Sequence, residues 1–196
     1  MAKEAQIVTQ INADLITNQF SSKKFQKGRF SGIAELITKK DGNQRQSVPV
    51  VINNAGDVTN LVIDDKYPFE LYHRHIGSTV DPVDDSEQYG DRVIRQETAQ
   101  MLLVVMGNRR RLDLTREELI TGIMLGMPLE LGSTFLTTNS LDNANIIPGD
   151  FNLDGEEAWN TEYNTTDVML KPETIFFTMT YGIESRVKVG CIDVCA

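Results

Sequence analysis

Residues 33–52 read IAELITKKDGNQRQSVPVVI, and a hairpin signal stands at the centre of this stretch. Two runs rich in apolar and β-branched residues flank Lys40-Asp41-Gly42-Asn43. Asp-Gly is a strong hairpin signal because both central residues of the turn tolerate a positive φ. Pro49 cannot donate a ladder hydrogen bond, so we expect the second run to be an edge strand or bulged. The stretch therefore predicts an antiparallel β-hairpin.

Apolar patterns on both sides of this hairpin extend the prediction. Upstream, residues Ala5 to Phe20 carry apolar side chains at helical spacing, which predicts one amphipathic helix. Downstream, Val58 to Ile63 predicts a third strand, which forms a meander with the hairpin. Pro68 then breaks the chain, and the alternating pattern of Phe69 to Ile76 predicts a fourth strand.

The second half of the chain predicts both helices and strands. Thr115 and Glu118 form a capping box, which predicts the start of a helix. The pattern of residues Arg92 to Met106 predicts either a helix or a polar segment that leads into a buried strand. The pattern of Glu173 to Val194 predicts two closing strands with a break at Gly182. The whole pattern predicts an α+β fold, with an antiparallel or mixed β-sheet, two or three helices and long projecting loops.

Two of these loops are long enough to be arms. The acidic loop 77–91 and the polar excursion 129–168 contain too few apolar residues to fold alone. We expect them to gain order by lying across another chain. The chain has 196 residues, which fits one domain over residues 1–196 with these arms attached.

Composition excludes several classes of protein. The 28 Asp and Glu residues against 19 Lys and Arg give a formal charge of −9, which disfavours sequence-specific DNA binding. Apolar runs are far shorter than a bilayer span, and no apolar secretory segment begins the chain, so we expect a soluble protein made in the cytosol. Cys191 and Cys195 match neither a CxxC pair nor a zinc site, and we expect reduced thiols. Phosphate-binding loops are absent from the sequence, and we expect no cofactor.

The two histidines, His73 and His75, share one face of the predicted fourth strand. Two imidazoles on one face are a workable start for a metal site. The alternative is an unrecognised hydrolase that uses His73 or His75 with a carboxylate from Asp81 to Glu87. The plainer alternative is an ordinary surface strand face. Because no catalytic set is complete, we expect the protein not to be an enzyme.

Asp150, Asn152 and Asp154 match the first half of a calcium loop, and Glu156 follows its glycine. The match then fails, because the twelfth position is Thr161 instead of a bidentate carboxylate, and helical flanks are missing. One hypothesis is a calcium-stabilised binding module. The alternative is an Asx-rich turn whose side chains bond their own backbone.

Charge is segregated along the chain. Residues 21–46 contain seven basic and two acidic side chains, residues 148–173 contain seven acidic and one basic, and Arg109 to Arg111 are basic again. These segments are either solvated faces or patches that meet on neighbouring subunits, in head-to-tail contacts that close into a ring where the rotation permits. The predicted subunit-interface residues are Lys39, Lys40, Arg45, Arg109, Arg110, Arg111, Asp84, Asp85, Asp154, Glu156 and Glu157.

Four features of the chain are together similar to ring-forming proteins of tailed bacteriophages. They are the amphipathic start Gln6 to Ile11, the basic hairpin, the capped helix from Thr115 and the β-rich end Lys188 to Val194. In outline the whole chain resembles their neck, connector and tail-terminator proteins, in the style of crAss-like phages. The resemblance implies a virion protein, synthesised in the host cytoplasm, that forms a homo-oligomeric ring beside portal, neck or tail proteins. DNA would pass through its lumen without sequence-specific binding, because acidic walls repel phosphate.

Overall fold

The chain combines two β-sheets with helices on both faces of the larger sheet. The computed structural model describes residues 2–18, 28–41, 44–52, 58–61, 67–81, 92–139, 141–163, 165 and 169–190. In these residues there are a five-stranded sheet, a three-stranded sheet and four helices. The predicted α+β class, with a mixed sheet, is therefore confirmed.

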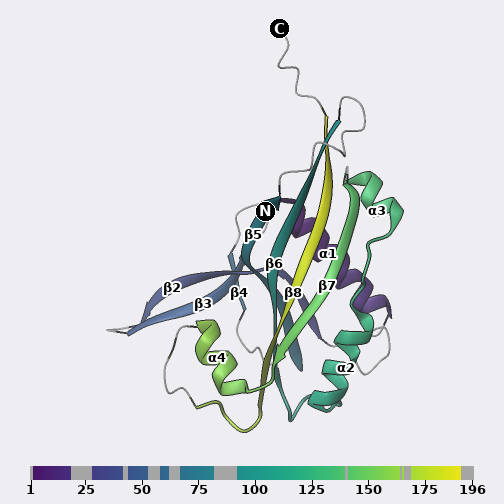
Figure 1. The fold of residues 1–196 in the computed structure, drawn as a ribbon. Helices are drawn as coiled ribbons and strands as arrows, with labels where there is room; N and C mark the ends of the chain where they lie inside the picture. Colours follow the sequence, from purple (N-terminus) through teal and green to yellow (C-terminus); the bar gives the residue numbers. More distant parts are fainter. Residues whose placement is uncertain are drawn as a thin grey trace.

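The larger sheet is built around two long central strands (Figure 1). Its strands are β1 (Arg29–Ile33), β5 (Phe69–Asp81), β6 (Arg92–Asn108), β7 (Leu141–Asn152) and β8 (Thr174–Gly190). Their order is β1-β5-β6-β8-β7, with β1 parallel to β5 and the other neighbours antiparallel. β6 and β8 stay in register over their whole length, from Arg92 opposite Gly190 to Asn108 opposite Thr174.

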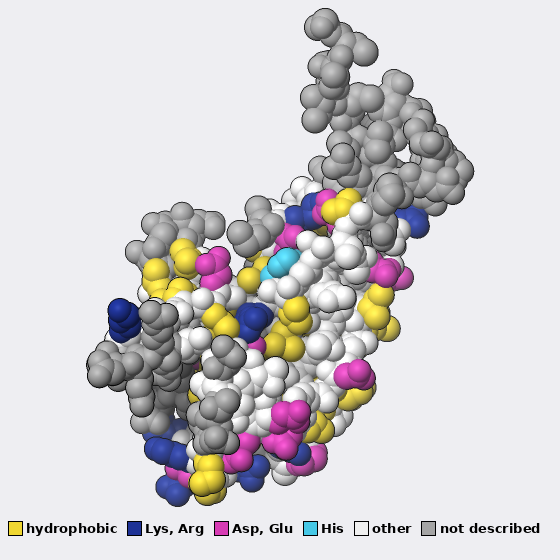
Figure 2. All heavy atoms as spheres, turned by 60° about the vertical axis from the view of Figure 1, so that its left-hand side comes forward, with side chains coloured by type: hydrophobic (Ala, Val, Ile, Leu, Met, Phe, Trp, Pro, Cys, Tyr) yellow, Lys and Arg dark blue, Asp and Glu magenta, His cyan; other side chains and the backbone are white. Residues whose placement is uncertain are grey.

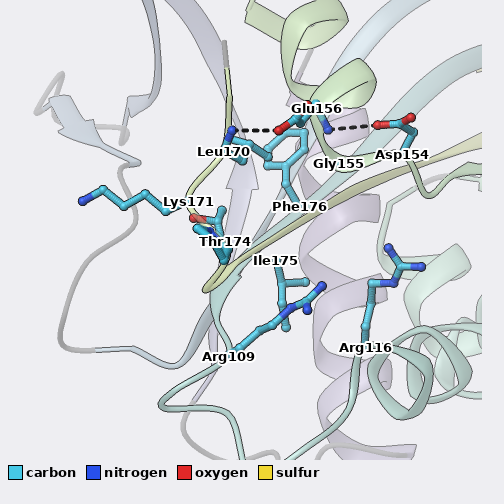
Figure 3. A pocket seen from close by; sticks show the side chains of 11 residues that line it. Arg109, Arg116, Asp154, Gly155, Glu156, Leu170, Lys171, Thr174, Ile175 and Phe176 are labelled. Atoms are coloured by element: carbon cyan, nitrogen blue, oxygen red, sulfur yellow. Dashed lines mark hydrogen bonds between the residues drawn. The ribbon is translucent and has the colours of Figure 1, made fainter.

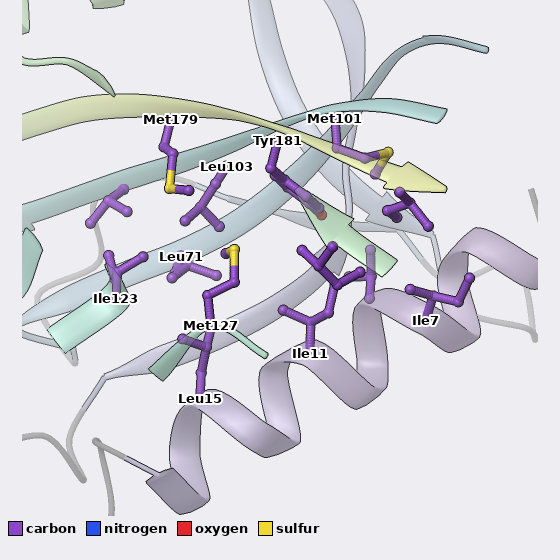
Figure 4. Packing of buried hydrophobic residues seen from close by; sticks show 14 of the residues in the cluster. Ile7, Ile11, Leu15, Leu71, Met101, Leu103, Ile123, Met127, Met179 and Tyr181 are labelled. Carbon is purple, nitrogen blue, oxygen red and sulfur yellow. The ribbon is translucent and has the colours of Figure 1, made fainter. Parts of the chain in front are cut away.

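One face of this sheet is covered by helices α1 (Ala2–Asn18) and α2 (Arg116–Gly126). Figure 4 shows apolar side chains of α1 directed at the sheet, and Ile7, Ile11 and Leu15 are almost fully buried there. Each such side chain contributes about 1.5–3 kcal/mol when it leaves water. The helix predicted over residues 5–20 is thus confirmed as far as Asn18, and residues 19–20 lie outside the described residues. The capping box of α2 is confirmed as well: Glu118 N donates to Thr115 Oγ1 at 3.1 Å, and Thr115 N donates to Glu118 Oε2 at 2.8 Å.

The opposite face carries the smaller sheet and helix α4 (Gly155–Tyr163). The smaller sheet has the order β2 (Glu35–Asp41), β3 (Gln44–Ile52) and β4 (Val58–Asn60), so the predicted hairpin and meander are confirmed. The turn residues Gly42 and Asn43 lie outside the described residues. A second hydrophobic cluster joins α4 to both sheets, with buried residues Ala34, Leu61, Tyr72, Val104, Met106, Ala158, Tyr163 and Phe176.

Two strand predictions are wrong. Pro49 lies in the middle strand β3 instead of an edge strand. The carbonyl oxygen of Pro49 accepts a hydrogen bond from Leu61 N at 2.9 Å, on the side of β4. In an antiparallel ladder the backbone N and O of one residue face the same neighbouring strand, so the N of Pro49 also faces this side. The missing N–H of Pro49 therefore falls just past the end of β4. Gly182 does not divide two closing strands, because it pairs with Gln100 and Ile147 inside the single strand β8.

The predicted arms also need correction. The segment 129–168 is not one polar excursion, since it contains α3 (Ser133–Thr138), β7 and α4. In the predicted acidic loop 77–91, residues 77–81 belong to β5, and residues 82–91 lie outside the described residues. Cys191 and Cys195 also lie outside them.

Candidate functional site

The candidate site is a groove at the end of the larger sheet, where β6 ends and β8 begins (Figure 3). A cavity of about 370 Å³ lies there between the start of α2 and the start of α4. Two more cavities, of about 370 and 360 Å³, share lining residues with the first and extend it on either side. We call the three cavities the end groove. Its charged lining residues are Arg109, Arg116, Glu117, Asp154, Glu156, Lys171 and Glu173.

One wall of the end groove carries Arg109 and Arg116, and Glu117 Oε1 lies 3.8 Å from Arg116 Nε. Arg109 directly follows β6 and is held by its backbone, whose N–H donates to the carbonyl of Glu173 at 2.8 Å. Arg116 is the first residue of α2, and its Nη1 donates to the carbonyl of Leu153 at 2.9 Å. Figure 3 shows the Arg109 and Arg116 guanidinium groups at the same side of the groove. Among the described residues, no carboxylate lies within ion-pair distance of Arg109.

The other wall is the acidic start of α4. Asp154 Oδ1 accepts hydrogen bonds from the N–H groups of Glu156 and Glu157, each at 3.1 Å, so Asp154 acts as an N-cap. Asn152 Oδ1 accepts from Asp154 N at 3.2 Å, which is an Asx turn. Glu156 Oε1 accepts from Leu170 N at 3.3 Å. These carboxylates are therefore already bonded to backbone N–H groups of their own subunit.

The calcium-loop match at residues 150–156 is thus the end of a strand followed by the start of a helix. Asp150 and Asn152 belong to β7, and α4 begins at Gly155, so the expectation that no helix adjoins this loop is wrong. A Cβ at Gly155 would lie 3.1 Å from the carbonyl oxygen of Phe176, which favours glycine at this close approach. Within the described residues, no group of three or more His, Cys, Asp or Glu side chains is arranged to hold a metal ion.

The structure brings together only some of the predicted interface residues. Arg109, Asp154 and Glu156 line the end groove, and the exposed Arg110, Arg111 and Glu157 follow them in the chain. Lys39 and Lys40 are exposed on the β2–β3 hairpin instead, where Lys39 Nζ donates to Asn60 Oδ1 at 2.7 Å. The side chain of Arg45 lies outside the described residues, as do Asp84 and Asp85. Figure 2 shows both signs of charge close together at the lower end of the molecule.

At the end groove, basic and acidic side chains that are separated along the sequence therefore lie close together. Arg109 and Arg116 face the acidic start of α4 across one groove of the same subunit. The lining residues of the end groove include no histidine or cysteine in the described chain, so a nucleophile with an imidazole base is not assembled there. The arrangement suits the binding of charged and apolar groups.

His73 is buried in the main core, so the alternative of a surface strand face is wrong for this residue. Its Nε2 lies 2.9 Å from Asn12 Oδ1, which only accepts, so Nε2–H donates. Its Nδ1 lies 2.8 Å from the Tyr181 hydroxyl, which donates to the neutral ring. Burial lowers the pKa of His73 to about 3. Both ring nitrogens are occupied, so His73 is a structural residue; His75 is only half-buried.

A buried polar network that the sequence did not predict fixes α4 to β5. Arg74 Nη1 donates to Glu162 Oε2 at 2.5 Å, and Glu162 is almost fully buried. The Tyr72 hydroxyl lies 2.8 Å from the Tyr163 hydroxyl and donates to Glu162 Oε1 at 3.3 Å. Burial raises the pKa of Glu162 although the Arg74 guanidinium opposes this effect. The spacing of Trp159 and Tyr163, four residues apart, was the available signal for an amphipathic helix here.

Comparison with family models, with curated proteins and with solved structures finds no match for this chain. Within the described residues, none of the helices has the length and the apolar character that crossing a bilayer requires.

Proposed function

We propose that the chain is a non-enzymatic structural subunit that forms an oligomeric ring at the head–tail junction or in the tail of a tailed bacteriophage. In this role it is a connector, and the genome passes through the ring without sequence-specific binding. The assembly part of the proposal is supported by the shape of the fold. The virion part is supported by the resemblance in sequence organisation.

The length of the central strands is the observation that carries the proposal. β6 and β8 contain 17 residues each. At about 3.4 Å per residue they are about 55 Å long. A compact globule of 196 residues has a diameter of about 40 Å, estimated from its radius of gyration. The strands are thus longer than the body that a chain of this size needs for its core.

In the part of the chain that the structure describes, no third strand pairs with the outer end of β6 and β8. In the described residues, β5 pairs with β6 only as far as Asp81 opposite Gln96, and β7 first meets β8 at Leu141 opposite Val187. Beyond these positions β6 and β8 form a two-stranded ribbon (Figure 1). An isolated two-stranded ribbon is marginally stable in water. Contact with a neighbouring subunit would stabilise it, and this favours an assembled state.

Native mass spectrometry of the full chain tests this proposal, with the chain alone and mixed with portal, neck and tail proteins of the same particle. We expect one closed oligomer of a single stoichiometry in at least one of these samples. A chain that stays monomeric in all of them contradicts the proposal. A heterologous contact that does not close would instead produce an open series of sizes, and this would contradict the ring.

A further inference from the structure

The end groove has the chemistry of a docking site for an extended segment. Its floor is apolar and includes Leu114, Leu170, Ile175 and Phe176. Trp159 and Met169 line its far end, and Met169 is 82% exposed. An apolar floor with a charged rim is typical of interfaces in which an apolar side chain is buried and charges set the register.

The rim carries three basic and four acidic side chains, and two of the basic ones can receive an acidic occupant. Arg109 and Lys171 line the central cavity, and neither has a carboxylate within ion-pair distance among the described residues. Asp154 and Glu156 stand on the opposite wall, bonded to backbone N–H groups of their own chain. An incoming carboxylate is therefore attracted to Arg109 and repelled by the α4 wall, whereas Arg116 already has Glu117 Oε1 at 3.8 Å. This asymmetry fixes the orientation of the occupant.

The chain contains a segment of matching chemistry. Residues 82–91 read PVDDSEQYGD, with four acidic residues, no basic residue, and Val83 and Tyr89 as apolar side chains. We propose that the end groove binds segment 82–91 of a second copy of this chain. The contact deepens the ring proposed above and rests on it.

The geometry of β6 excludes docking within one copy. Segment 82–91 connects Asp81 to Arg92, at one end of β6, whereas Arg109 follows the other end of this 17-residue strand. The two ends of β6 are about 55 Å apart. Ten residues held at both ends reach out by about 20 Å at most. The acidic segment therefore reaches the end groove of another copy only, which makes the contact heterologous.

Peptide binding to the full chain tests this site directly. The probe is a fluorescent peptide of residues 82–91 with blocked ends, and the measurement is fluorescence anisotropy at low ionic strength. We expect saturable binding that is about tenfold weaker for Arg109→Glu, because the substitution replaces an attractive charge by a repulsive one. A peptide with Asp84 and Asp85 replaced by Asn is expected to bind more weakly as well. The matched control is Lys40→Glu, the same charge change at an exposed residue that does not line the groove.

Three results would overturn the site. They are no saturable binding, equal weakening by Arg109→Glu and Lys40→Glu, or displacement of the peptide by a DNA duplex whose own binding requires Arg109. The last result would assign the groove to nucleic acid.

Assembly of the full chain separates this inference from the proposed function. If Arg109→Glu weakens both peptide binding and oligomer formation, and Asp84→Lys combined with Asp85→Lys restores the oligomer, both proposals are supported. If the peptide binds but the chain never assembles, the site is correct and the ring is wrong. If the ring forms equally well in Arg109→Glu and peptide binding is unchanged, the ring stands and the end groove is not its contact.

Discussion

His73 links the stability of the core to pH. Because burial lowers its pKa to about 3, the unfolded chain binds a proton below about pH 6.5 that the folded chain does not bind. The free energy of unfolding is therefore expected to fall as the pH falls from 6.5 towards 3. Between about pH 6.5 and about pH 5 this contribution amounts to about 2 kcal/mol. Urea unfolding at both pH values measures it.

The variant His73→Gln isolates this contribution, since glutamine does not titrate. We expect its unfolding free energy to depend less on pH than that of the wild type, by the same amount. His75→Gln is the matched control, because it removes an imidazole from the same strand and leaves His73 in place. Equal pH dependence in His73→Gln and the wild type would show that His73 is not the source.

Arg74 compensates the buried charge of Glu162. Arg74→Met leaves that carboxylate without its cation, and the expected loss at neutral pH is about 3 kcal/mol. The pKa of Glu162 then rises further, so the variant is expected to lose stability as the pH rises and to recover it in acid. Denaturant unfolding over this pH range checks both effects.

The double variant Arg74→Met with Glu162→Gln is the control for lost packing. It removes the buried charge together with its partner, so we expect it to be more stable than Arg74→Met alone at neutral pH. If the two variants are equally stable there, the ion pair is not what fixes α4 to β5.

At the scale of elements, the start of α4 distinguishes a helix cap from a calcium loop. Asp154→Ala removes an acceptor for two backbone N–H groups and is expected to cost about 1 kcal/mol. Asp154→Asn is expected to change little, because asparagine caps equally well. Asp150→Ala is the control from the same sequence. Thermal unfolding with calcium and with a chelator measures these effects.

If Asp154 acts only as a helix cap, calcium does not stabilise this loop. We expect the melting temperature of the wild type to be the same with and without calcium. A rise with calcium that Asp154→Ala and Asp150→Ala both abolish would restore the hypothesis of a calcium-stabilised module.

The elements that sequence predicts correctly are those with local signals. The capping box at Thr115 needs only residues three apart, and the Asp41-Gly42 hairpin needs only its own turn. β7 was missed because bulges between Leu141 and Asn143, and again after Pro148, break the two-residue period of its buried side chains. Asn- and Gly-rich composition then suggests a loop, although long-range pairing with β8 makes a strand.

The candidate site was predicted only in part, for a related reason. Arg109, Asp154 and Glu156 were selected by charge, but the sequence does not indicate that they line one groove. Their proximity follows from the chain reversal that pairs β6 with β8, which brings residue 108 opposite residue 174. The Arg74–Glu162 pair was missed because its partners are 88 residues apart and have no local pattern.

At the scale of the whole molecule, the long β6–β8 pair gives the subunit two distinct ends. One end carries the end groove, and the other carries the ribbon and the connection to segment 82–91. Contacts between unlike ends are heterologous, and they close into rings where the rotation permits. Because they involve charges at the surface, we expect assembly to weaken as ionic strength rises. Sedimentation velocity over a salt series checks this; assembly that strengthens with salt would indicate an apolar contact instead.

Electron microscopy of the negatively stained full chain is the direct test of the proposed ring. The specimens are the chain alone and the chain with its neighbouring virion proteins. We expect closed rings of one symmetry, in which adjacent subunits meet through unlike ends. Single particles of monomer size in every specimen, or dimers joined through identical surfaces, would contradict it.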